Sequence, residues 1–142
     1  MIEQRVFVLR HTVTFEDTNV VGNVYFANYV RWQGHCRETF LHENAPEVIR
    51  DLSDGLRIMT VRCSCEFYAE LNAFDELEIR MRLEWQQQNR VSLSFDYVCI
   101  SRGGEELVAR GSQEVAFMRV SGGTSAATHP PHSLLRALTA YA

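Results

Sequence analysis

Three consecutive segments of this 142-residue chain alternate apolar and polar residues with a period of two. They run from Met59 to Phe67, from Leu77 to Trp85 and from Val91 to Cys99. Such a period places the apolar side chains of each strand on one face. Ser101–Gly104 supplies a tight turn, and Leu107 to Val120 returns as a fourth strand. The pattern predicts an antiparallel meander with one face in the core and one in water.

A helical period precedes this sheet, between Asn23 and Leu41. Apolar residues recur there every three or four positions, which is typical of a helix: Tyr25, Tyr29, Trp32, Cys36 and Phe40, with Phe26, Val30 and Leu41 on a neighbouring stripe. A helix that is apolar around much of its circumference must be buried. We therefore expect an α+β fold in which the antiparallel sheet wraps around this helix.

The ends of the chain complete a single domain over residues 1–142, with its core at about 5–120. The apolar run from Val6 to Phe15 predicts a further strand. Ser121 to Thr128 is small and polar, which favours a loop or a disordered stretch, and residues 130–141 predict a short C-terminal helix that starts near a proline.

All 14 positively charged residues are arginine, and the net charge is −4. Without lysine, Schiff-base chemistry and a phosphate-loop lysine are excluded. The arginines are scattered along the chain, so we expect no nucleic-acid partner. We also expect a cytoplasmic chain with no membrane contact, because it has neither a signal peptide nor a long apolar segment.

The four cysteines predict reduced thiols and no metal site. They form no Cys-x-x-Cys pair, and Cys63 and Cys65 should point into the apolar face of their strand. No histidine is placed to complete a tetrahedral site with them. His35 lies about 100° around the helix from Cys36, a poor position for a base that would activate its thiol.

Two polar features suggest a site. Arg37 lies on the helix stripe that holds Val30 and Leu41, where a guanidinium must be paired or must face a polar ligand. Its partner is either a carboxylate, Glu66 or Glu38, or a bound molecule.

The second feature is the segment from Phe15 to Asn23, which leads into the helix. The unpaired N–H groups of a helix N-terminus can bind a developing oxyanion. The alternative is a simple capping turn with Asn23 as the N-cap.

The run from Phe15 to Trp32 closely resembles the signature of hotdog-fold thioesterases of the 4-hydroxybenzoyl-CoA thioesterase type, Asp-x-Asp-x-x-Gly-x-x-(aromatic)-x-x-Asn-Tyr. Phe67 to Asp75 is similar to a later strand-and-turn segment of that family, with Glu70 in place of its usual proline. The resemblance covers about residues 5 to 120. It implies a long helix wrapped by an antiparallel sheet, active sites at a dimer interface, and a homotetramer built as a dimer of dimers.

One departure from the signature bears on the chemistry. The second acid of the motif, which is catalytic in the family, is Asn19 in this chain, and an amide can act neither as nucleophile nor as general base. This replacement, together with Arg37, resembles the thioesterases that accompany enediyne polyketide synthases. Those enzymes release a β-keto polyene from an acyl carrier domain.

The resemblance and the residues together predict hydrolysis of an acyl thioester on phosphopantetheine. Asn19 would donate a hydrogen bond or hold the attacking water, Arg37 would stabilise negative charge or anchor a β-keto oxygen, and Tyr29 would either assist or simply pack in the core. Substrate contacts are expected near Gly22, Tyr25 and Phe26, at the helix N-terminus. The β-keto acid product would lose carbon dioxide to give a methyl ketone, and no cofactor is implied.

Two alternatives stay open. A general acyl-CoA thioesterase would recruit Asp17, Glu16 or Glu66 as the base. A non-catalytic subunit would bind acyl chains or dock a carrier without cleaving the thioester. An acid limb in the pH profile would indicate a carboxylate base.

Overall fold

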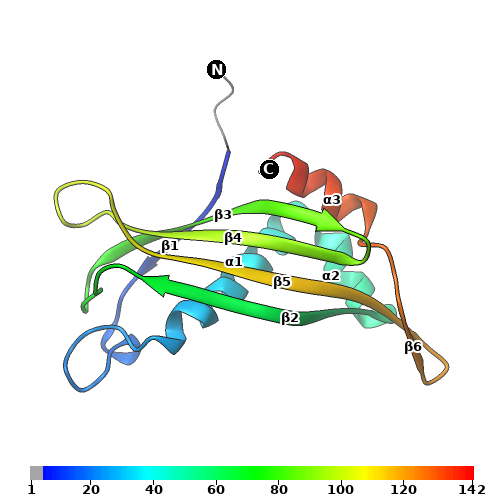
Figure 1. The fold of residues 1–142 in the computed structure, drawn as a ribbon, viewed down its shortest axis with the longest axis horizontal. Coiled ribbons are helices and arrows are strands. Elements are labelled where there is room, and N and C mark those ends of the chain that lie inside the picture. The colour runs from blue at the N-terminus through cyan, green and yellow to red at the C-terminus, as the bar shows by residue number, and fades with distance from the viewer. Residues whose placement is uncertain (1–4) are drawn as a thin grey trace.

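The computed structural model describes residues 5–142, and a curled antiparallel sheet packed against one long helix dominates it (Figure 1). The strands are β1 (Phe7–Thr12), β2 (Leu56–Phe67), β3 (Glu76–Gln87), β4 (Arg90–Cys99), β5 (Glu106–Ser121) and β6 (Thr124–Ala127). The helices are α1 (Ala27–Asn44), α2 (Pro46–Asp51) and α3 (His132–Thr139), with short 3-10 turns at Phe15–Asp17 and Leu52–Asp54. The α+β arrangement expected from the sequence is confirmed.

The order of the strands differs from a simple meander. β3, β4 and β5 follow one another as predicted, but the sheet order is β1-β3-β4-β5-β2. β2 therefore pairs with β5 at one edge, while β1 pairs with β3 at the other. Strand periodicity reports which face a side chain takes and carries no information about which strand lies alongside.

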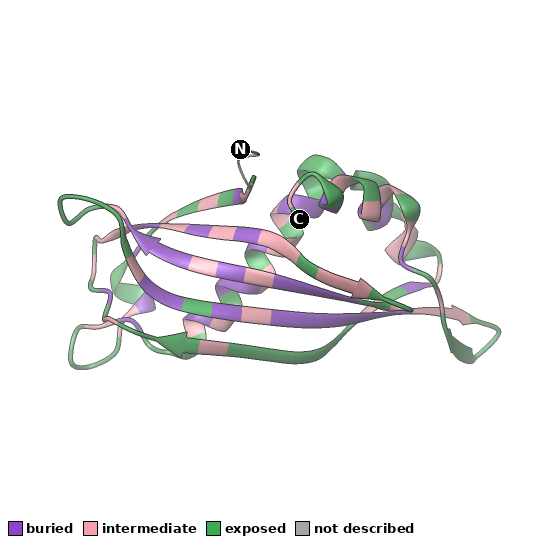
Figure 2. Ribbon diagram, turned by 45° about the horizontal axis from the view of Figure 1, so that its top comes forward, coloured by how far each residue is buried: buried purple, intermediate pink, exposed green. Residues whose placement is uncertain are grey.

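The prediction that β2 turns its apolar residues into the core is wrong for most of the strand. Met59 and Val61 are 55% and 42% exposed, Cys63 is exposed, and Cys65 is only partly buried. β2 is an edge strand with a register shift between Thr60 and Arg62, and Figure 2 shows it largely exposed beside the buried central strands. Within residues 5–142 nothing pairs with its outer edge.

The central strands carry the core, as their alternation predicts. The apolar residues of β4 from Val91 to Cys99 are all buried, and so are Leu77, Ile79 and Met81 of β3. They face the buried side of α1, which presents Tyr29, Trp32, Cys36, Phe40 and Leu41. One layer of sheet and one long helix thus enclose a single core.

The start of α1 lies later than its apolar period suggests. The helix begins at Ala27, so Tyr25 and Phe26 precede it and are 48% and 62% exposed. Phe26 occupies the cap position without a side-chain cap, and the expectation of Asn23 as N-cap is wrong. The outer face of the helix, with Arg31, His35 and Glu38, is not buried.

The segment after β5 is a hairpin, not a loop. Gly122 and Gly123 adopt φ values of 56° and 84°, which suit a two-residue turn between β5 and β6. The predicted C-terminal helix is confirmed as α3, which buries Leu134 and Leu138. α2 and α3 lie at the C-terminal end of α1 (Figure 1).

Candidate functional site

A pocket of about 220 Å³ opens beside the N-terminal end of α1. We call it the helix-end pocket; it is lined by Asn23, Val24, Phe26, Tyr29, Phe67, Ala69 and Glu70. Two of the predicted site residues, Phe26 and Tyr29, therefore share one pocket. The pocket lies between the loop that enters α1 and the segment that leaves β2.

Backbone hydrogen bonds narrow the choice of oxyanion donor. The N–H of Gly22 donates to Asn19 O at 3.0 Å, that of Val24 to Leu71 O at 2.8 Å, and that of Tyr25 to Asp17 O at 3.0 Å. These three N–H groups already donate to backbone carbonyls and are not available to a ligand. Within residues 5–142 the Phe26 N–H has no acceptor. Phe26 lines the helix-end pocket and directly precedes α1, at the positive end of the helix dipole, where a developing negative charge is favoured.

Asn19 lies in the exposed loop before α1, and its two side-chain groups differ. Its Oδ1 accepts the Val21 N–H at 3.0 Å, while its NH₂ group has no acceptor in the described part of the chain. The positive φ of Gly22, 92°, closes the same turn. The fold therefore presents Asn19 as a hydrogen-bond donor, which suits charge stabilisation better than base catalysis.

The buried Asp17 holds the loop before α1 in place through its hydrogen bonds. Only 2% of the residue is exposed, and its carboxylate accepts hydrogen bonds from Thr14 at 3.0 and 3.2 Å, lies 2.9 Å from His11 Nε2 and pairs with Arg31 at 3.2 Å. Burial by itself raises the pKa of Asp17, but the Thr14 and His11 contacts outweigh it and hold the pKa below its usual value. The Asp17 carbonyl also accepts the Asn28 side-chain NH₂ at 2.8 Å.

Tyr29 is 3% exposed and stacks edge-on against Phe67 at 4.9 Å. Its backbone carbonyl accepts the Tyr97 hydroxyl at 2.6 Å. Burial raises the pKa of Tyr29 well above its ordinary value, with Cys65 and Glu70 adding to the shift. The hydroxyl is therefore protonated at neutral pH and can only donate or accept a hydrogen bond.

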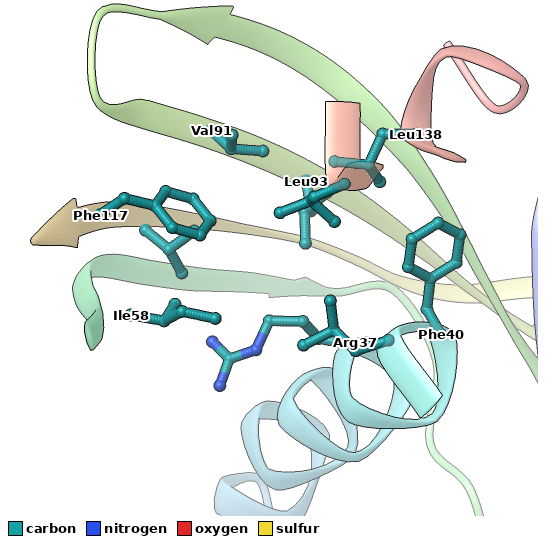
Figure 3. Close-up of a pocket in the computed structure, with 10 residues that line it drawn as sticks. Arg37, Phe40, Ile58, Val91, Leu93, Phe117 and Leu138 are labelled. Carbon is teal, nitrogen blue, oxygen red and sulfur yellow. The ribbon is translucent and has the colours of Figure 1, made fainter. Parts of the chain in front are cut away.

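Arg37 borders a second, inner cavity of about 20 Å³ between α1, the sheet and α3 (Figure 3). All other residues around this inner cavity are apolar: Phe40, Leu41, Ile58, Val91, Leu93, Val115, Phe117, Leu134 and Leu138. Burial lowers the pKa of Arg37, and Glu38 partly offsets the shift. An arginine stays protonated under such a perturbation.

The expected ion pair of Arg37 with Glu66 or Glu38 does not form. Its Nη1 donates instead to Gln113 Oε1 at 2.7 Å, and its buried Nε has no partner in residues 5–142. A neutral amide does not pair the positive charge, and Glu38 offsets the effect of burial only in part. The alternative of a polar ligand for Arg37 thus keeps its physical basis.

The structure does not bring Asn19 and Arg37 together within one chain. Arg37 lies ten residues beyond the first residue of α1, which corresponds to about 15 Å along the helix axis. Asn19 lies in the loop before that helix. Within one copy of the chain, Asn19 and Arg37 therefore lie too far apart to act at the same reaction centre.

Three carboxylates that the sequence offered as bases lie outside the helix-end pocket. Asp17 and Glu16 line a different surface hollow beside Arg31, and Glu66 accepts the Tyr68 hydroxyl at 3.1 Å. Glu70 is the carboxylate that lines the pocket. The sequence signalled it only by the replacement of a family proline. Gln113 gave no signal at all.

The Cys36 thiol and the side chains that could bind a metal also bear on the chemistry of the site. Burial raises the pKa of Cys36 to about 12, so its thiol is neutral. Residues 5–142 contain no group of three or more His, Cys, Asp or Glu side chains that could hold a metal ion. In the same range, no helix has both the length and the apolar character needed to cross a membrane.

Comparison with known proteins gives a consistent result. Residues 13–138 match the model of the thioesterase-like superfamily. A structure of the dynemicin thioesterase is 51% identical, with a TM-score of 0.92 and 96% of each chain covered. A structure of 4-hydroxybenzoyl-CoA thioesterase in complex with 4-hydroxybenzoyl-CoA is 20% identical, covers 94% of this chain and 99% of its own, and has a TM-score of 0.82.

A curated relative from Aquifex aeolicus (strain VF5), described as a putative esterase, is 27% identical over 65% of this chain and 70% of its own length. The matched family segment includes the helix-end pocket, the inner cavity and most of α3. This chain is a hotdog-fold member of the thioesterase-like superfamily.

Proposed function

We propose that this chain hydrolyses a β-keto polyenoyl thioester carried on the acyl carrier domain of an iterative, enediyne-type polyketide synthase in the cytoplasm. The observation that carries the proposal is Arg37, a half-buried cation that forms no ion pair within residues 5–142 and lies at the edge of an apolar cavity. The 51% identity to the dynemicin thioesterase, whose structures describe polyene binding, supports the same substrate class.

The proposed reaction depends on hydrogen-bond donors that stabilise negative charge and not on a general base. Water attacks the thioester carbonyl carbon, the C–S bond breaks, and the phosphopantetheine sulfur leaves with a proton that water supplied. The Phe26 N–H and the Asn19 NH₂ stabilise the oxyanion that forms on the thioester carbonyl, and Arg37 binds the β-keto oxygen, where its positive charge favours the negative charge that develops on the reacting chain. The free β-keto acid then loses carbon dioxide to give a methyl ketone.

The proposed site needs two copies of the chain. About 15 Å of helix separates Arg37 from the loop of Asn19 in one copy, so Arg37 must come from a second copy. The exposed apolar edge of β2, with Met59 and Val61, offers a surface for pairing. In this arrangement Asn19 and Phe26 of one copy face Arg37 and the inner cavity of the other, and we propose a homotetramer made of two such dimers.

A general acyl-CoA thioesterase is the second candidate, because Glu70 lines the helix-end pocket and could serve as a base. A carrier-docking subunit without activity is the non-enzymatic alternative. Both differ from the proposal in what they do to a loaded synthase.

The test is incubation of the chain with a polyketide synthase whose carrier domain holds its full-length acyl chain, followed by intact-protein mass spectrometry. We expect loss of the acyl mass from the carrier and a methyl ketone in the extract, with the Arg37→Ala variant as the inactive reference. Retention of the acyl chain with tight binding would indicate the docking subunit. Faster cleavage of simple acyl-CoA esters than of the loaded carrier would indicate the general thioesterase.

A further inference from the structure

The inner cavity is too small for an acyl chain in the present arrangement. Its volume of about 20 Å³ holds about one water molecule, and its lining is apolar apart from Arg37. A chain that enters beside Arg37 must therefore displace part of the wall. The inference below rests on the proposed function, because it concerns where the acyl chain of that substrate ends.

The walls of the inner cavity differ in how firmly they are held. β4 and β5 are paired in one register from Arg90 to Tyr97, with Val91 opposite Val115 and Leu93 opposite Gln113. α1 is an 18-residue helix with one face in the core. Parting β4 from β5 would break this pairing, and moving α1 would break the hydrogen bonds from Gln33 Nε2 to Ser64 O at 2.9 Å and from the Tyr97 hydroxyl to Tyr29 O at 2.6 Å.

α3 is the wall that contacts the rest of the cavity through apolar side chains alone. Within residues 5–142 no residue of α3 shares a backbone hydrogen bond with a strand; the nearest tethers are Thr128 N–H to Phe117 O at 3.0 Å before it and Leu83 N–H to Tyr141 O at 2.9 Å after it. Leu134 and Leu138, 4% and 2% exposed, fill the cavity side of the helix.

Arg37 and α3 lie at opposite ends of the inner cavity. Figure 3 shows Arg37 on α1 and Leu138 on α3 at opposite sides of the cavity, with Leu93 between them. Phe40 lies beside Leu138, and its ring meets that of Tyr141 edge-on at 5.6 Å. A chain whose β-keto oxygen binds Arg37 would therefore point its apolar end at α3.

We propose that α3 is the end wall of the acyl site and that Leu138, assisted by Leu134, determines the length of the chain that is accepted. The ligand class is an extended, apolar acyl chain anchored by an oxygen at Arg37. Chains that end at Leu138 displace α3 least and are bound best. Longer chains must push α3 further away from Phe40 and lose more of that packing.

The expected effect can be stated as a fold-change. One extra methylene that does not fit an apolar pocket changes kcat/KM by about 10- to 200-fold. A leucine-to-alanine change in a core can open about 150 Å³, enough for a six-carbon ring. Leu138→Ala should therefore accept chains about two to four carbons longer than the wild type prefers.

The experiment measures kcat/KM for a series of pantetheine thioesters that carry β-keto acyl chains of increasing length. We compare the wild-type protein with the variants Leu138→Ala, Leu134→Ala and Leu138→Phe. Arg136→Ala, at an exposed position of the same helix, is the matched control. The optimum should move to longer chains in the two alanine variants and to shorter chains in Leu138→Phe, and it should stay in place in the control. Thermal melting verifies that each variant is folded, and Leu138→Val replaces Leu138→Ala if the latter is not.

The outcomes separate this inference from the proposed function. An unchanged length optimum in every variant, with hydrolysis intact, overturns the role of α3 and leaves the function in place. Absence of hydrolysis for every length and for the loaded carrier overturns the function. In that event, affinities for polyene ketones of graded length, measured by tryptophan fluorescence, still decide whether Leu138 limits the chain: the alanine variants gain affinity for the longer ligands, or the inference fails.

Discussion

The guanidinium of Arg37 on α1 donates a 2.7 Å hydrogen bond to the side-chain oxygen of Gln113 on β5. Gln113 is only 4% exposed, and the Nε of Arg37 remains buried without a partner in the described chain. A half-buried cation whose hydrogen-bond acceptor is a neutral amide keeps its charge available for a ligand. Such an arrangement lowers the stability of the fold unless a bound polar group pairs with the charge.

We expect Arg37→Ala to lower turnover by about 100-fold or more, because a lost donor to a developing negative charge costs about 2.7–4 kcal/mol. Steady-state kinetics on a β-keto acyl thioester measures the change. Arg50→Ala, an exposed arginine on α2, is the control and should keep wild-type turnover. Equal turnover of Arg37→Ala and the control would remove Arg37 from the reaction.

Mixing two inactive variants tests whether the site is shared. Asn19→Ala and Arg37→Ala each lack one group, so neither homodimer should have an intact site. After unfolding and refolding of an equal mixture, random pairing gives heterodimers in which one of the two sites is complete. We expect recovery of about a quarter of wild-type activity. A mixture no more active than its components would place both groups in the same copy. Val20→Ala, in the same exposed loop, is the control for Asn19→Ala.

The pH profile distinguishes donor catalysis from a carboxylate base. Neither Asn19 nor Arg37 loses a proton near neutral pH, so kcat/KM should show no acid limb between about pH 4 and 7. Glu70→Gln should leave both the rate and the profile unchanged within a few-fold. An acid limb that disappears in Glu70→Gln would instead identify Glu70 as the general base.

Asp17→Asn should weaken the fold in a pH-dependent way. The pKa of Asp17 lies below its usual 3.8 in the folded chain, so its carboxylate stabilises the fold above about pH 3.8 and loses this effect as the pH falls through the folded pKa. At pH 7 the variant should lose about 1–3 kcal/mol of unfolding free energy, because Thr14 and His11 lose their charged acceptor, the buried Asp17 carboxylate. Urea unfolding at pH 7 and pH 3 measures the difference, which should shrink at the lower pH. A difference independent of pH would mean that Asp17 acts through packing alone.

Gly111→Ala should destabilise the junction of α1 and the sheet. A Cβ at this position would lie 2.3 Å from Gln33 Nε2 and 2.8 Å from Ser64 O, where Gln33 donates to that carbonyl at 2.9 Å. We expect a loss of about 1–3 kcal/mol from overpacking. Gly34→Ala on α1 has no atom within 4 Å of the new methyl and should gain about 0.5–1 kcal/mol. Chemical denaturation of both variants checks the opposite signs.

The amino-acid sequence by itself determined the elements that hold the core. The alternation in β3 and β4 and the period around Trp32 and Phe40 fixed which faces are buried, because side-chain direction in a strand or a helix follows from local geometry. The motif from Asp17 to Tyr29 likewise indicated the protein family. The replacement of the family's acid by Asn19 argued against a carboxylate base at that position.

Only the tertiary structure decided how these elements meet. Strand order placed β2 at an exposed edge. The N–H groups of Gly22, Val24 and Tyr25 have acceptors, while that of Phe26 has none within residues 5–142. Gln113 and Glu70 entered the site from segments far along the chain, and α1 set Arg37 apart from Asn19. These relations depend on contacts between residues distant in sequence, and a local pattern of apolar and polar residues does not encode such contacts.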